Sequence, residues 1–173
     1  TFTVDDAALD SLGEGETLEQ VYEVIVADDN GGSASRFVTV TITGRNDGPE
    51  IVTGQGTAGA VREAGSDADG IVVDPGTPVA TGTLAGFDPD AGAVLTWSGN
   101  ASGIYGNFTI DPVTGAWTYT LNNGAANGLS AGQVEAESFL VTLTDDAGAS
   151  TIEAVTVTVT GTNDAPMAEA LSG

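Results

Sequence analysis

The chain contains 173 residues, and its 25 Asp and Glu against three Lys and Arg give a formal net charge of −22 at pH 7. So acidic a surface repels phosphate backbones and anionic lipids, which excludes nucleic acids as partners. Since the chain has neither His nor Cys, it has no imidazole base, no thiol nucleophile and no nitrogen- or sulfur-ligated zinc site. No apolar run is long enough to cross a bilayer, and no secretory signal is visible at Thr1, so we expect a soluble piece of a longer protein without membrane insertion.

Carboxylates are the remaining chemical groups, and they suit either a glycosidase-type pair or a site for hard cations. Without Cys no disulfide can stabilise the fold, so a protein that works outside the cell needs another stabilising element. Calcium is the cofactor we expect in that role. Acidity also keeps proteins soluble without binding anything, and composition alone does not choose between these interpretations.

The first predicted strands lie in the N-terminal third of the chain. Tyr22, Val24 and Val26 alternate with residues of the opposite face, and residues 38–43 read VTVTIT, with a β-branched side chain at every position. The loop at 28–33 contains two glycines, which supply positive φ. These features predict a β-hairpin.

Seven more strands are predicted further along the chain. They fall at 58–63, 79–86, 94–98, 106–110, 116–121, 139–143 and 155–160, and a short helical turn is expected within 124–132. The last two strands alternate as the first pair does, and a similar acidic, Gly-containing loop connects them. Seven short strands separated by turn residues are typical of an all-β Greek-key sandwich of the immunoglobulin or cadherin type.

An internal repeat organises the chain. The segment NDGP at 46–49 recurs as NDAP at 163–166, 117 residues later, and without a gap 19 of residues 1–49 are identical to 118–166. We therefore expect the C-terminal part of one repeat at 1–47, a complete repeat at 48–164 and the start of the next repeat at 165–173. Residues 1–47 hold only about three strands, too few to bury a core alone. A neighbouring chain would complete them, or they would be ordered by docking on the complete repeat.

Acidic segments from three parts of the chain are expected to meet. In a seven-strand Greek key, the second-to-third and sixth-to-seventh loops lie at the end where the chain enters. The converging residues are Asn46, Asp47, Asp88, Asp90, Asp145 and Asp146. Carboxylates about 4 Å apart repel by roughly 4 kcal/mol per pair at an effective dielectric constant near 20, and a divalent cation reverses that sign. Six to eight oxygen ligands suit calcium, although Asp, Asn, Gly and Pro are also ordinary turn residues.

Five groups of residues resemble one known family. They are Glu63, the stretch from Gly82 to Asp90, the YGNF segment at 105–108, the GAWTYTL segment at 115–121 and the GTNDAP segment at 161–166. In this order they are similar to the VCBS repeat, a bacterial cadherin-like module, and the resemblance covers the whole complete repeat. It implies a giant secreted adhesin of the RTX type, displayed on a bacterial cell surface and acting in cell adhesion and biofilm formation.

The resemblance also implies roles for individual residues. Asp88 and Asp90 resemble the Asp-x-Asp pair of cadherins, and Asn46 and Asp47 resemble their linker ligands. The same arrangement is implied where the chain leaves the repeat, with Asn163, Asp164 and Glu63. Asp28, the counterpart of Asp145 in the partial repeat, completes the set of expected calcium ligands.

Three functions compete at this stage. The first is a calcium-rigidified spacer whose partners are the adjacent repeats of the same chain. The second is a calcium-dependent carbohydrate-binding module, whose partners are surface glycans; it requires exposed aromatic rings or hydroxyls near the metal, and we expect Trp97, Tyr105, Trp117 and Tyr119 to lie in the core instead. Self-association with other copies of the chain stays open beside both. The third, a carboxylate glycosidase, needs two carboxylates about 5–10 Å apart in a cleft. No spacing suggests such a cleft, so we do not expect an enzyme.

Overall fold

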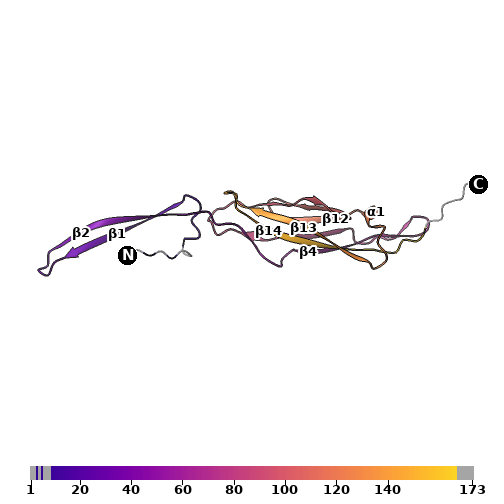
Figure 1. Cartoon of the computed structure of the whole chain (residues 1–173), viewed down its shortest axis with the longest axis horizontal. Helices are drawn as coiled ribbons and strands as arrows, with labels where there is room; N and C mark the ends of the chain where they lie inside the picture. Colours follow the sequence, from indigo (N-terminus) through magenta and orange to yellow (C-terminus); the bar gives the residue numbers. More distant parts are fainter. Residues whose placement is uncertain (1–2, 4, 6–8, 167–173) are drawn as a thin grey trace, which may run out of the picture.

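The computed structural model describes residues 3, 5 and 9–166, and it is an extended molecule with two parts laid end to end (Figure 1). At one end stands a long hairpin of β1 (Thr17–Ala27) and β2 (Ser33–Thr43), paired antiparallel along their whole length. At the other end lies a β-sandwich that begins after the linker at 44–49. No helix among the described residues is long and apolar enough to span a membrane.

The sandwich has two four-stranded sheets. One has the order β10-β11-β12-β7, and the other has the order β4-β14-β13-β9, in which β4 runs parallel to β14. The bounds are β4 (Ala58–Arg62), β7 (Val79–Thr83), β9 (Thr96–Ser98), β10 (Ala101–Ser102), β11 (Gly106–Ile110), β12 (Ala116–Leu121), β13 (Val134–Thr144) and β14 (Ser150–Thr160). All seven strands predicted for the complete repeat are present, and the all-β sandwich is confirmed.

Two short strand pairs and a helical turn complete the fold. Strand β3 (Glu50–Ile51) pairs with β8 (Gly86–Phe87), and β5 (Gly65–Ser66) pairs with β6 (Val72–Asp74). The predicted helical turn is α1 (Asn123–Ala126). The predicted strand at 79–86 is in fact interrupted, because β7 ends at Thr83 and β8 then pairs with the incoming chain.

Aromatic side chains fill the space between the two sheets. Strict alternation sends every second residue of β11 and β12 inward, so Trp117 and Tyr119 are 1% and 0% exposed. The ring of Phe108 stacks on that of Phe139 at a centroid distance of 4.9 Å, which joins the two sheets. Trp97 is also buried, and Tyr105 packs half-buried against this cluster. The expectation that these aromatic residues belong to the core is therefore confirmed.

The hairpin of β1 and β2 has the same pattern without a core. Tyr22 and Val38 are 42% and 46% exposed, whereas their counterparts 117 residues later, Phe139 and Val155, are buried. Among the described residues no further strand covers this face. Of the three or so strands predicted in 1–47, two lie in its described part.

Candidate metal centre

The linker that enters the sandwich contacts two of its loops. Asn46 Nδ2 donates to Asp145 Oδ2 at 2.9 Å, in the loop between β13 and β14. The backbone N–H of Asp47 donates to Asp90 Oδ2, also at 2.9 Å, in the segment between β8 and β9. Residues 43 and 99 positions apart in the sequence therefore meet at one point, which we call the N-terminal junction.

Two carboxylate oxygens at this junction are buried without any hydrogen-bond donor. Asp90 is 7% exposed, and its backbone N–H donates to Asp88 Oδ1 at 2.9 Å. This contact leaves Asp88 Oδ2 and Asp90 Oδ1 fully buried and without a partner. Burying an unpaired carboxylate oxygen costs several kcal/mol, so such a pair calls for a counter-charge.

Asp145 lies at the same junction and is fixed by hydrogen bonds. It is buried at 6% exposure, and its Oδ1 accepts from the backbone N–H of Ala149 at 2.8 Å. The hydrogen bond from Asn46, helped by backbone N–H groups of the loop, lowers the pKa of Asp145 below its usual value, although burial acts in the opposite direction. The residue is therefore ionised at neutral pH.

Asp146 contacts the neighbouring loop of the sandwich. Its Oδ1 accepts from the backbone N–H of Val94 at 2.9 Å and so connects the two loops of the sandwich. It still lines a cavity of about 250 Å³ at the junction, together with Asn46 and Asp90.

Sequence reasoning missed two carboxylates of this cavity, Glu14 and Glu16. Glu14 Oε2 accepts from the backbone N–H of Asn46 at 3.1 Å, and Glu16 Oε2 accepts from that of Gly13 at 3.3 Å. In the repeat these residues match Ala131 and Gln133, so a comparison of the two copies hides them. The sign of them in the sequence is that two carboxylates, separated by one residue, come directly before the first strand.

The donor set fits calcium in its chemistry, since every candidate ligand offers oxygen. Within the described part of the chain, however, no three carboxylates are gathered closely enough to form a metal cluster. Asp145, Asp146 and Glu14 are instead each hydrogen-bonded to an amide or a backbone N–H group. If an ion is bound, some of these hydrogen bonds must be exchanged for metal contacts.

The other end of the sandwich brings together Glu63 and the outgoing linker; we call it the C-terminal junction. Glu63 is 0% exposed, and its Oε2 accepts from the backbone N–H of Thr162 at 2.9 Å. Burial raises the pKa of Glu63, the Thr162 N–H partly offsets this, and the charge of Asp164 raises it further. Asp164 Oδ1 accepts from the backbone N–H and the hydroxyl of Ser66, while Asn163 lies beside Gly65.

Asp28 is not part of either junction. Its Oδ1 accepts from the backbone N–H groups of Asn30 and Gly32, at 2.9 and 2.7 Å. Asp145 makes the same kind of loop contact with Ala149, so the repeat is conserved in its local geometry. The tip of the hairpin, however, points away from the sandwich (Figure 1).

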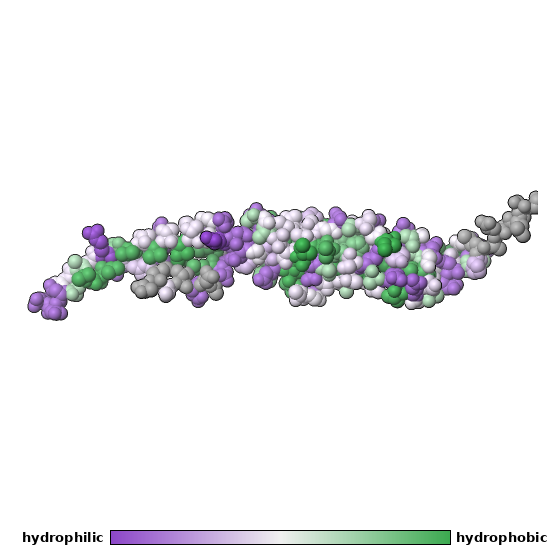
Figure 2. Space-filling view, viewed as in Figure 1, coloured by the Kyte–Doolittle hydropathy of each residue, from purple (hydrophilic) through white to green (hydrophobic). Residues whose placement is uncertain are grey.

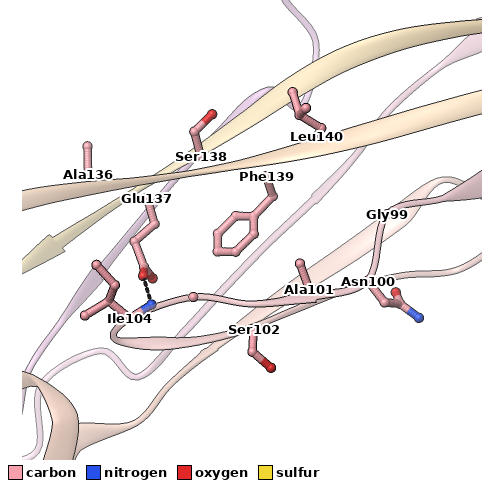
Figure 3. Close-up of a pocket in the computed structure, with 11 residues that line it drawn as sticks. Gly99, Asn100, Ala101, Ser102, Ile104, Ala136, Glu137, Ser138, Phe139 and Leu140 are labelled. Atoms are coloured by element: carbon pink, nitrogen blue, oxygen red, sulfur yellow. Dashed lines mark hydrogen bonds between the residues drawn. The ribbon is translucent and has the colours of Figure 1, made fainter.

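Another groove, of about 680 Å³, lies away from both junctions, between the segment at 99–104 and strand β13 (Figure 3). Its lining contains one carboxylate, Glu137, which accepts from the Tyr119 hydroxyl and from the backbone N–H groups of Ile104 and Tyr105. Burial, and then the contact with Glu137, raise the pKa of Tyr119. The one ring in the lining, Phe139, is buried. The groove thus presents neither a carboxylate pair nor an exposed aromatic platform for a sugar.

Comparisons with known proteins agree with this architecture. The family model of the bacterial cadherin-like domain matches residues 46–161. Among solved structures, the protocadherin gamma B2 extracellular cadherin domains 1–5 are similar with a TM-score of 0.51 and 16% identity, over 91% of this chain and 26% of that one. The protocadherin gamma B4 extracellular domain matches with a TM-score of 0.48 and 18% identity, over 92% of this chain and 22% of that one.

The chain thus spans about a quarter of the length of these solved structures. No curated protein matches the sequence. The likeness to the protocadherins concerns the fold alone, whereas the family match extends from the linker Asn46 to the end of β14 and includes every loop of the N-terminal junction that the sandwich contributes. The chain belongs to the bacterial cadherin-like domain family.

Proposed function

We propose that the chain is a spacer from a tandem array of bacterial cadherin-like repeats, stiffened by calcium at the junctions between repeats. Membership of this family suggests an adhesion-type module at the cell surface and a structural rather than an enzymatic role. The array would belong to a giant surface adhesin of the RTX type and act in cell adhesion and biofilm formation.

One observation carries the calcium part of the proposal. Asp88 Oδ2 and Asp90 Oδ1 are buried without a donor at the contact between the linker and the sandwich. A divalent cation supplies the missing positive charge, and Asp145 and Asn46 provide further oxygens at the same place. An ion bound at the N-terminal junction would make bending of the linker costly, because bending would separate its ligands.

The same charges explain why the spacer would respond to calcium. Carboxylates near the low-dielectric interior repel strongly, and the repulsion between the linker and the loops vanishes when an ion binds. We expect an affinity of about 10⁻⁴ to 10⁻³ M, in the range of extracellular modules. Binding to the folded state alone stabilises it, by an amount that grows with the free calcium concentration.

A calcium titration followed by thermal melting tests the proposal. We expect the melting temperature to rise as calcium is added, and the rise to be lost in the double variant Asp88→Asn, Asp90→Asn. The variant Asp29→Asn removes a charge from the exposed hairpin tip and serves as the control, with a rise equal to that of the unchanged chain. A melting temperature of the unchanged chain that does not depend on millimolar calcium would contradict the calcium joint.

A further inference from the structure

The short hairpin of β5 and β6, residues 65–74, is attached to the outgoing linker, and we call it the junction hairpin. Its Ser66 binds Asp164 Oδ1 through both the backbone N–H and the hydroxyl, at 2.8 and 2.7 Å. The backbone N–H of Ala165 donates to the Ser66 carbonyl at 2.9 Å. The linker therefore runs beside β5 and is held by backbone as well as side-chain contacts.

An ion pair fixes the base of the junction hairpin to the sandwich. The guanidinium of Arg62, at the end of β4, contacts both carboxylate oxygens of Asp74, at 2.5 and 2.8 Å. The backbone N–H of Gly76 adds a third contact to Asp74 at 3.0 Å. At the tip, Asp67 Oδ1 accepts from the backbone N–H groups of Asp69 and Ile71. The segment is thus a defined element rather than a loose loop.

This hairpin exposes three consecutive apolar side chains. Ile71, Val72 and Val73 are 61%, 57% and 65% exposed. In a chain with a net charge of −22, a run of this kind at the end of the sandwich, next to the outgoing linker, is a surface suited to contact with another apolar surface. Because the outgoing linker leads to the following repeat, that repeat is the partner within reach of this surface.

The two ends of the sandwich show complementary halves of one junction. Asp47 and Asp164 occupy the same place in the sequence repeat. At the N-terminal junction the backbone N–H of this Asp is bound by Asp90 of the sandwich that follows it. At the C-terminal junction its carboxylate is bound by Ser66 of the sandwich that precedes it. In a junction that contains both repeats, the junction hairpin and the segment before Asp90 therefore both lie next to the same Asp.

An exposed aromatic ring is present on that segment. Phe87, three residues before Asp90, is 51% exposed although it belongs to β8. It pairs with Glu50, three residues after Asp47, so it lies next to the linker as well.

We propose that the junction hairpin is a second, metal-independent contact between repeats, in which Ile71, Val72 and Val73 pack against Phe87 of the following repeat. The inference rests on the proposed tandem arrangement but not on calcium. An apolar contact attracts two acidic repeats without any counter-ion, so the joint keeps part of its stiffness when calcium is low.

The test uses a tandem chain in which residues 1–164 continue into residues 48–173, joined at the natural period of the repeat. Because the sequence has no cysteine, Ile71→Cys, Val72→Cys or Val73→Cys in the first sandwich can be paired with Phe87→Cys in the second and treated with a short bis-maleimide. Ala131→Cys, at an exposed side chain that also lies beside the outgoing linker, replaces the hairpin cysteine in the control.

We expect at least one hairpin pair to cross-link about tenfold or more faster than the control pair, in calcium and in chelator alike, because a docked pair exceeds the effective concentration that a flexible link provides. Rates equal to the control in both conditions would overturn the inference, and acceleration in calcium alone would overturn its metal independence. The melting temperature of the same tandem chain with and without calcium is read separately, so failure of the calcium joint is distinguishable from failure of the hairpin contact.

Discussion

The backbone N–H of Asp47 lies 2.9 Å from Asp90 Oδ2, so the linker is bound to the sandwich by a contact that needs no ion. Asn46 adds a second contact of this kind to Asp145. The junction is therefore partly ordered before any cation binds, and what it lacks is compensation for the buried oxygens of Asp88 and Asp90. An ion that supplies this charge would complete an existing contact rather than create one.

Replacement of Glu14 by Gln tests whether the partial repeat contributes to the junction. Glu14 contacts Asn46 across the linker and lines the cavity that contains Asp90. We expect calcium affinity to fall by about one order of magnitude, because affinity follows the number of charged oxygen ligands. Isothermal titration calorimetry measures the change. Glu19→Gln, on the exposed strand β1, is the control. Equal calcium affinities for the two variants would show that Glu14 does not contribute to the site.

A pair of equivalent residues tests the difference between the two parts of the chain. Phe139→Ala removes a buried ring that stacks on Phe108, and we expect a loss of about 3–5 kcal/mol in the free energy of unfolding of the sandwich. Tyr22→Ala changes the equivalent position in the exposed hairpin and should cost far less. Urea unfolding followed by tryptophan fluorescence reports on the sandwich, because both Trp97 and Trp117 lie there. Similar losses for the two variants would contradict this description of the core.

Gly82→Ala tests the close approach of β7 to the core. A Cβ at position 82 would lie 2.6 Å from the ring of Trp117, closer than packed atoms allow. We expect a loss of about 1–3 kcal/mol, because the ring is buried and its Nε1 donates to the Gly56 carbonyl, so a shift of the ring disturbs the core. Gly128→Ala, where nothing lies within 4 Å, is the matched control and should leave the urea midpoint unchanged.

Asp74→Asn gives a prediction about pH. The hydrogen bond from Arg62 is the main reason that the pKa of Asp74 falls from 3.8 to about 2. Because the folded-state pKa is depressed, the carboxylate stabilises the fold fully above pH 3.8, and this contribution is lost as the pH falls through about 2.

The difference in melting temperature between the unchanged chain and Asp74→Asn should therefore be constant at neutral pH and disappear in strong acid. Asp69→Asn, in the tip of the same hairpin, controls for the general loss of a negative charge. A difference that persists below pH 2 would show that the ion pair with Arg62 is not its cause.

Much of the fold could be predicted because its pattern is local. Alternating residues such as Val155 and Val157 can bury one face only as a strand, and the Gly-containing loop after Asp145 returns the chain antiparallel. The repeat located the linkers, and the loop order of a Greek key with alternating strand directions predicted that Asp90 and Asp145 meet the linker residues. The sequence therefore determined the class of fold, the position of both junctions and the oxygen-rich character of the N-terminal one.

Tertiary structure decided which of the acidic residues belong together. Glu14 reaches the N-terminal junction because the loop before β1 contacts the linker, a contact that no local sequence pattern encodes. Asp28 has the loop geometry of Asp145 but lies at the far tip of the hairpin, where no sandwich loop among the described residues surrounds it. The junction hairpin likewise depends on the pairing of Arg62 with Asp74, twelve residues apart, and of Ser66 with Asp164, ninety-eight residues apart. Contacts between distant segments are set by packing, and local periodicity carries no information about them.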